Sequence, residues 1–198
     1  HDEQPSATKA VAVKSLAFCE RPGADKVRDV FCPPAEPGIQ SLHALQEALG
    51  INPARQGYES RNPGELKVSR DNFQVSFVVA LSHSTSLSGH VVSALNPRVF
   101  FLTQEAVMAY SRGVQRVELA VAARDRKGFN FYLIEFEQAC NAAEGGCLPG
   151  DLFTPRVEND WQRLVVRDDE DLKNSALDCR QCHARARPEM QLLMRELE

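Results

Sequence analysis

The clearest hydrophobic pattern in the chain is an alternation of apolar and polar positions in its middle third. Apolar side chains occupy every second position from Phe73 to Leu81 and again from Val117 to Val121, and this period of two is typical of half-buried β-strands. Residues 129–136 are apolar on both faces, which suits a central strand, and a further apolar run covers residues 99–102. The charged segment 124–128 ends in glycine and is predicted to be a hairpin loop. We therefore expect a mostly antiparallel sheet in the middle of the chain.

Helical spacing of apolar residues occurs in fewer places. Leucines recur on one face of the segment Ser41–Leu49, Ser41 suits the N-cap, and Gly50 follows as a stop signal. Short helices are also predicted at Gln104–Arg112, ended by Gly113, and at Leu172–Leu177. A last amphipathic helix is expected where apolar residues again recur at helical spacing, at Met190, Leu193, Met194 and Leu197.

Breaker residues divide the chain into three regions. Residues 1–65 are rich in proline and glycine, so we expect mostly loops around one short helix, with a short strand or helix at residues 11–18. Residues 66–167 form the predicted sheet-rich core, which ends with a strand at residues 161–166. Residues 168–198 form a separate C-terminal segment. The predicted fold class is α+β, with the antiparallel sheet in the middle, a few helices, and this C-terminal segment.

Composition and charge narrow the range of functions. The chain has 198 residues, of which 43% are hydrophobic and 25% are charged, as in ordinary globular proteins. The formal net charge of −4 argues against a nucleic-acid partner. The longest apolar run, around Val75 to Leu81, is far too short to form a transmembrane segment. The first residue is His1 and no signal peptide is visible, so we expect a mature chain whose signal has been removed.

The most specific motif lies near the C-terminus. Cys179-Arg180-Gln181-Cys182-His183 reads C-x-x-C-H, the attachment signature of a c-type haem. Two thiols at this spacing can each form a thioether with one porphyrin, and the adjacent histidine can then ligate the iron. A redox dithiol is the first alternative, but it does not need the histidine. Half of a zinc site is the second, but it needs another ligand pair at matching spacing, and none is visible.

On this motif the sequence resembles the c-type cytochromes, and the resemblance covers these five residues. It implies one covalently attached haem c, bound through Cys179 and Cys182, with His183 as the proximal iron ligand. A sheet-rich region followed by C-x-x-C-H near the C-terminus is similar in layout to the monohaem family of cytochrome c prime beta and the hydroxylamine-oxidising cytochrome with a lysine–haem cross-link.

The other four cysteines indicate the compartment. Cys19, Cys32, Cys140 and Cys147 permit three pairings, and the two local pairs, Cys19–Cys32 and Cys140–Cys147, close the shortest loops at the lowest entropic cost. Disulfides persist in oxidising compartments, and covalent haem attachment, as the resemblance implies, also belongs outside the bacterial cytoplasm. We therefore expect a periplasmic or extracellular protein. The alternative is four free thiols in a cytosolic protein.

The distal side of the iron decides the function that the resemblance implies. Two strong protein ligands make an electron carrier, whereas an open face makes a binder or a catalyst. His83 and His90 lie in a polar loop after the strand that ends at Leu81, and either one is a candidate distal ligand. The alternative is that both are solvated loop histidines. The remaining candidate ligands are His1, His43, Met108, Met190 and Met194.

Charged residues on both sides of the motif have two interpretations each. Arg180, Arg185 and Arg187 suit the carboxylates of haem propionates. The acidic run Asp168–Asp171 either steers a basic redox partner or is a solvated turn leading into a helix N-terminus, where negative charge is favourable.

The leading functional hypothesis is therefore a monohaem c-type cytochrome that transfers electrons between redox proteins outside the cytoplasm. An electron carrier is favoured over an enzyme. One alternative is a five-coordinate haem protein that binds a gas or oxidises a small nitrogen compound or peroxide. Another is the haem subunit of a larger respiratory, membrane or surface complex.

Overall fold

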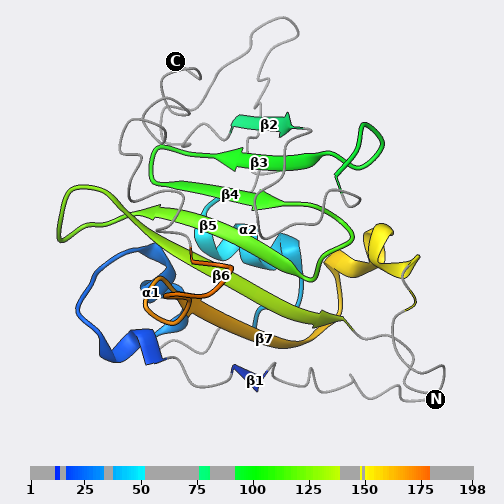
Figure 1. Ribbon diagram of the computed structural model, residues 1–198. Helices are drawn as coiled ribbons and strands as arrows, with labels where there is room; N and C mark the ends of the chain where they lie inside the picture. Colours follow the sequence, from blue (N-terminus) through cyan, green and yellow to red (C-terminus); the bar gives the residue numbers. More distant parts are fainter. Residues whose placement is uncertain are drawn as a thin grey trace, which may run out of the picture.

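A seven-stranded sheet forms the centre of the molecule (Figure 1). The computed structural model describes residues 12–13, 17–33, 38–51, 76–80, 92–138, 148 and 150–178. The strands are β1 (Ala12–Val13), β2 (Ser76–Ala80), β3 (Arg98–Leu102), β4 (Ala106–Tyr110), β5 (Arg116–Ala122), β6 (Phe129–Gln138) and β7 (Trp161–Asp168). Their order across the sheet is β1-β7-β6-β5-β4-β3-β2. Each strand from β2 to β7 is antiparallel to its neighbour in sequence, and β1 is added in parallel beside β7.

Two short helices, α1 (Lys26–Phe31) and α2 (Leu42–Leu49), lie against one face of this sheet (Figure 1). The predicted caps of α2 are confirmed: the Ser41 hydroxyl accepts a hydrogen bond from the Ala44 N–H at 3.0 Å. Gly50 ends the helix in the left-handed conformation, with φ of 68°, which glycine adopts without steric cost. Single 3-10 turns complete the described elements, at η1 (Ala17–Glu20), η4 (Asp151–Phe153) and η5 (Pro155–Glu158).

One hydrophobic core joins the helices to the sheet. Alternate residues of β4, β5 and β6 point to the same face because side chains alternate along a strand. They meet buried residues of η1, α1 and α2, and Trp161 stacks on Phe136 with ring centroids 4.0 Å apart. The N-terminal helices therefore share their core with the sheet. Its fully buried members include Phe18, Val27, Leu45, Ile51, Met108, Val117, Val121, Ile134 and Val157.

The α+β class and the antiparallel sheet are thus confirmed. The predicted strands of the middle and of residues 161–166 correspond to β2, β3, β5, β6 and β7 within the described ranges. The predicted hairpin loop lies between β5 and β6, where the Ala123 N–H donates to the Gly128 carbonyl at 3.0 Å. The segment 11–18, predicted as a short strand or helix, contains the two-residue strand β1 and the first two residues of η1.

The helix predicted at Gln104–Arg112 is wrong, because this segment contains strand β4. The two faces of β4 are both covered: Ala106, Met108 and Tyr110 face the core, and Ala109 on the other face is also buried. The strand therefore shows no polar alternation that would distinguish it from a buried helix. Its backbone pairs with β3 on one side and β5 on the other, and this tertiary pairing overrides the local helical preference.

The helix predicted at Leu172–Leu177 is also wrong, because these residues form consecutive turns. Asn174 has a positive φ of 62°. The Ser175 hydroxyl donates to the Leu172 carbonyl at 2.6 Å and accepts from the Leu177 N–H at 3.1 Å. Such side-chain hydrogen bonds offer the backbone an alternative to the helix. The helix predicted around Met190 lies outside the described residues.

Candidate functional site

The described chain approaches the C-x-x-C-H motif through an ordered series of turns. Strand β7 ends at Asp168, whose carboxylate accepts hydrogen bonds from the N–H groups of Glu170 at 3.0 Å and Asp171 at 3.1 Å. The Leu172 N–H then donates to the Asp168 carbonyl at 3.2 Å, and the Leu172 side chain is buried. The turns continue to Asp178, the residue directly before Cys179. The position of the chain at Asp178 is therefore tied through these turns to the end of β7.

The acidic run at this place is paired within the molecule. The guanidinium of Arg21 donates hydrogen bonds to two carboxylates, from Nη1 to Asp168 and from Nη2 to Asp171. Arg28 lies 3.8 Å from the other carboxylate oxygen of Asp168. Hydrogen bonding to Asp171 is the largest of the effects that raise the pKa of Arg21, followed by hydrogen bonding to Asp168. Asp168 and Asp169 are only 8% and 6% exposed, so this part of the run is neither a solvated turn nor a free surface for a partner.

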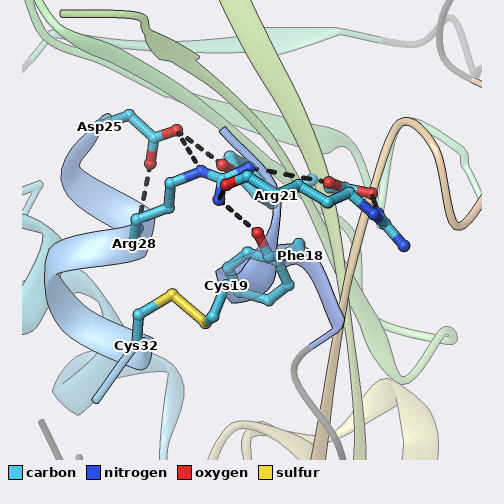
Figure 2. The surroundings of a disulfide bond; sticks show 8 residues. Phe18, Cys19, Arg21, Asp25, Arg28 and Cys32 are labelled. Atoms are coloured by element: carbon cyan, nitrogen blue, oxygen red, sulfur yellow. Dashed lines mark hydrogen bonds and ion pairs between the residues drawn. A yellow bond between two sulfur atoms is a disulfide. The ribbon is translucent and has the colours of Figure 1, made fainter. Parts of the chain in front are cut away.

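Arg21 is carried by a loop that a disulfide closes (Figure 2). The predicted pair Cys19–Cys32 is present, with Cα atoms 5.5 Å apart, and joins η1 to the residue that follows α1. Inside the loop, Arg28 donates hydrogen bonds to the carbonyl of Phe18 and, at 2.9 Å, to that of Arg21. The Arg28 guanidinium also lies over the Phe18 ring, 5.5 Å from its centroid. The disulfide and Arg28 together hold the loop in one shape.

Asp25 fixes the same loop to the sheet. It is fully buried and caps α1, accepting from the Arg28 N–H at 3.0 Å. Its other oxygen accepts from the Tyr132 hydroxyl and from the Asn130 side-chain amide, both at 2.6 Å. Burial first, and then the hydrogen bond to Asp25, raise the pKa of Tyr132. Since Asn130 and Tyr132 belong to β6, the loop has an anchor in the middle of the sheet.

A cleft of about 380 Å³ lies where the loop, the β5–β6 hairpin and the end of β7 meet. Ligand pockets for small molecules are lined mainly by apolar and aromatic side chains, whereas this cleft is lined largely by charged groups. The cations are Arg21, Arg28 and Arg126, and the anions are Asp125, Asp168, Asp169 and Glu170. Several of these charges compensate one another, since Arg21 bonds to Asp168 and Arg28 lies 3.8 Å from the same carboxylate.

Two of the predicted iron-ligand candidates fall among the described residues. Met108 is completely buried in the core between β3 and β5 and packs as an ordinary core residue. His43 lies on the exposed side of α2, with its Nε2 3.9 Å from a carboxylate oxygen of Glu47. The described residues contain no cluster of three or more histidine, cysteine or acidic side chains able to hold a metal ion. Among the described residues, Met108 is thus enclosed by core side chains, and His43 has the Glu47 carboxylate beside it but no metal-ligating cluster.

The other predicted site residues lie outside the described part of the chain. They are the haem-attachment residues Cys179, Cys182 and His183, the flanking Arg180, Arg185 and Arg187, and the distal candidates His83 and His90. The pair Cys140–Cys147, His1, Met190 and Met194 lie outside it as well.

Sequence reasoning missed three residues that organise this region: Arg21, Asp25 and Arg28. A signal for one of them was present, because Asp25 precedes a short run with apolar residues at Val27 and Phe31, as an N-cap does. The prolines and glycines near Asp25 indicated a loop instead, so no helix was predicted after it. No local signal connects Arg21 with Asp168, because the two residues are 147 positions apart in the chain.

Comparisons with protein-family models, with curated proteins and with solved structures found no match to this chain. In the part of the chain that the structure describes, no helix combines the length and the apolar character needed to span a membrane.

Proposed function

We propose that this chain is a monohaem c-type cytochrome that transfers electrons between redox proteins outside the cytoplasm. The observation that carries the proposal is the sequence Cys179–His183, because two thiols and an imidazole at this spacing match the thioether and axial-ligand chemistry of a c-type haem. The thiols of Cys179 and Cys182 would hold the porphyrin, and the imidazole of His183 would ligate the iron on one side.

The chemistry of the remaining cysteines supports this assignment. Cys19 and Cys32 are bonded to each other, so neither takes part in a metal site with the motif. A zinc site would therefore need its second ligand pair from elsewhere. A disulfide also fits an oxidising compartment, which is where we place the protein: the periplasm or the cell exterior.

When bound, the haem supplies the one-electron redox chemistry, and the protein tunes its potential through axial ligation, burial and hydrogen bonding. On the side opposite His183, we propose His90 or His83 as the second ligand. Met108 is not available for this role, because it is fully enclosed in the core. Arg180 and Arg185 would pair with the propionates, since guanidinium and carboxylate groups form strong charge-assisted hydrogen bonds.

The first test is whether the chain acquires covalent haem. The protein is expressed behind an added bacterial export signal in a host that matures c-type cytochromes, and haem is detected by a stain after denaturing electrophoresis. The wild type is expected to retain haem, and the Cys179→Ala/Cys182→Ala variant to lose it. The matched control, Cys140→Ala/Cys147→Ala, removes two other cysteines and is expected to keep the haem. A wild type without covalent haem would overturn the proposal.

The second test is an optical spectrum of the reduced protein with and without carbon monoxide. A low-spin spectrum that carbon monoxide does not change means two protein ligands and supports an electron carrier. A spectrum that shifts with carbon monoxide means an open iron and overturns the carrier in favour of a gas-binding or catalytic haem. His90→Ala and His83→Ala, with His43→Ala as the control, then identify the distal ligand.

A further inference from the structure

The disulfide-closed loop, residues 19–32, contacts the end of β7 and the turn that follows it through the side chain of Arg21. Figure 1 shows the turns that follow β7 beside α1, although the two segments are far apart in sequence. Arg21 makes this contact with two nitrogens of one guanidinium, one bonded to Asp168 and the other to Asp171. These carboxylates belong to the first and fourth residues of the first turn after β7, which spans residues 168–172. Arg21 therefore closes this turn from outside and compensates the repulsion between its acidic groups.

The turn that Arg21 closes is the first of three connected turns. The Leu172 N–H donates to the Asp168 carbonyl at 3.2 Å, the Ser175 N–H to the Leu172 carbonyl at 3.0 Å, and the Asp178 N–H to the Ser175 carbonyl at 3.2 Å. Each turn begins at the residue where the previous one ends. The Asn174 N–H adds a hydrogen bond to the Asp178 carboxylate at 2.9 Å. A displacement of the first turn is therefore transmitted along the backbone to Asp178, which is bonded directly to Cys179.

The loop that carries Arg21 has little freedom of its own. The Cys19–Cys32 disulfide closes it, and Arg28 bonds to the Arg21 carbonyl within it and to the carbonyl of Phe18, the residue just before it (Figure 2). Asp25 attaches it to Asn130 and to Tyr132 in β6. Arg21 is thus held by a rigid frame that spans the disulfide loop and the centre of the sheet.

We propose that this disulfide-closed loop positions the haem-attachment segment, with Arg21 as the positioning residue. The inference rests on the proposed function, since it assigns a role at the same haem. The loop fixes the turns that connect Asp168 to Asp178, and through Asp178, the residue before Cys179, it is proposed to influence the surroundings of the haem. Loss of the Arg21 contacts changes the haem environment without touching Cys179, Cys182 or His183.

The experiment compares the haem reduction potential and the reduced optical spectrum of purified, haem-loaded variants. Arg21→Gln removes the guanidinium. Arg21→Lys keeps the positive charge, but its single ammonium group replaces the two guanidinium nitrogens that bond to the two carboxylates. Arg163→Gln is the matched control, because Arg163 is also an exposed arginine bonded to a carboxylate, Glu137 at 2.7 Å, on the sheet face opposite the helices.

The expected result is a shift of the potential in Arg21→Gln, a smaller shift in Arg21→Lys, and no shift in Arg163→Gln. Equal potentials and spectra in Arg21→Gln and the wild type would overturn the inference. Equal shifts in Arg21→Gln and Arg163→Gln, with none in Arg21→Lys, would also overturn it, because the loss of one surface charge would then suffice. If Arg21→Gln does not accumulate, Asp171→Asn removes one of its two acceptors and is compared with the wild type in the same way.

The outcome also separates this inference from the proposed function. A wild type without covalent haem contradicts the proposed function itself. A wild type with normal haem attachment, combined with an unchanged potential in Arg21→Gln, contradicts the positioning role alone. A Cys19→Ser/Cys32→Ser variant with attached haem is expected to shift the potential in the same direction as Arg21→Gln, because it releases the frame that holds Arg21.

Discussion

Replacement of Asp25 is expected to destabilise the fold more than any other single change to a charged residue near the disulfide loop. The carboxylate is fully buried, caps α1 through the Arg28 N–H, and accepts hydrogen bonds from Tyr132 and Asn130. Asp25→Ala removes all three acceptor contacts at once. It also leaves the buried Tyr132 hydroxyl without this acceptor, while the Asn130 amide, which is only part-buried, loses one as well.

The expected cost follows from these contacts. Loss of an N-cap costs about 1 kcal/mol, and each hydrogen bond to a charged group contributes about 1.5–3 kcal/mol. Because such contributions are not additive, we expect Asp25→Ala to lower the free energy of unfolding by about 4 kcal/mol, close to the cost of breaking a buried charged pair. Asp25→Ser keeps an N-cap acceptor, so its cost is expected to be smaller by about 1 kcal/mol.

The assay is urea unfolding at pH 7, followed by far-ultraviolet circular dichroism. Asp29→Ala is the control, because Asp29 lies on the same helix and pairs with Arg124 at the surface, where an ion pair contributes less than about 1 kcal/mol. A double-mutant cycle between Asp25→Ser and Tyr132→Phe isolates the hydrogen bond between these two side chains, with an expected coupling of about 1.5–3 kcal/mol.

Two results would refute this reasoning. If Asp25→Ala were no more destabilising than Asp29→Ala, the buried network would not contribute to the stability of the native state. If the cycle gave a coupling energy near zero, the hydrogen bond between the Tyr132 hydroxyl and the Asp25 carboxylate would not stabilise the native state. The loop could then not be regarded as anchored to β6.

Three further measurements test other parts of the fold. Cys19→Ser/Cys32→Ser opens a loop with a sequence separation of 13 residues and is expected to lower the unfolding free energy by about 3 kcal/mol, measured by urea unfolding against the wild type. Burial, as the largest effect, raises the pKa of both Tyr110 and Tyr132. Because the folded-state pKa is raised, their contribution to stability is complete below about pH 10 and is lost at higher pH, by about 1.4 kcal/mol per pH unit for each tyrosine. Urea titrations from pH 8 to 11 should show this decline, and a flat profile would contradict it. Trp161→Ala removes a fully buried ring and is expected to cost about 3–5 kcal/mol, and a cost below about 1 kcal/mol would show that this position is not part of the core.

Part of the candidate site could be predicted from the sequence because its signals are local. The Cys19–Cys32 pair was correct because a short loop favours closure. The caps of α2 were correct because Ser41 and Gly50 have specific backbone roles at the two ends of a helix. The C-x-x-C-H motif can be recognised in the sequence for the same reason, since its chemistry depends on five consecutive positions. The haem assignment that rests on it remains a prediction.

The sequence by itself determined the period-two pattern of the sheet, the ends of α2 and the spacing of the motif, since each depends on residues within a few positions of one another. The tertiary structure alone decided that β4 is a strand, because its backbone is paired on both sides and both of its faces are covered. It also decided the role of the acidic run. Asp168 and Asp171 resemble a solvated turn until Arg21, brought there by the packing of α1 against the sheet, neutralises them. Such a contact has no sequence signature, because the energy that selects it comes from the packing of elements that are remote along the chain.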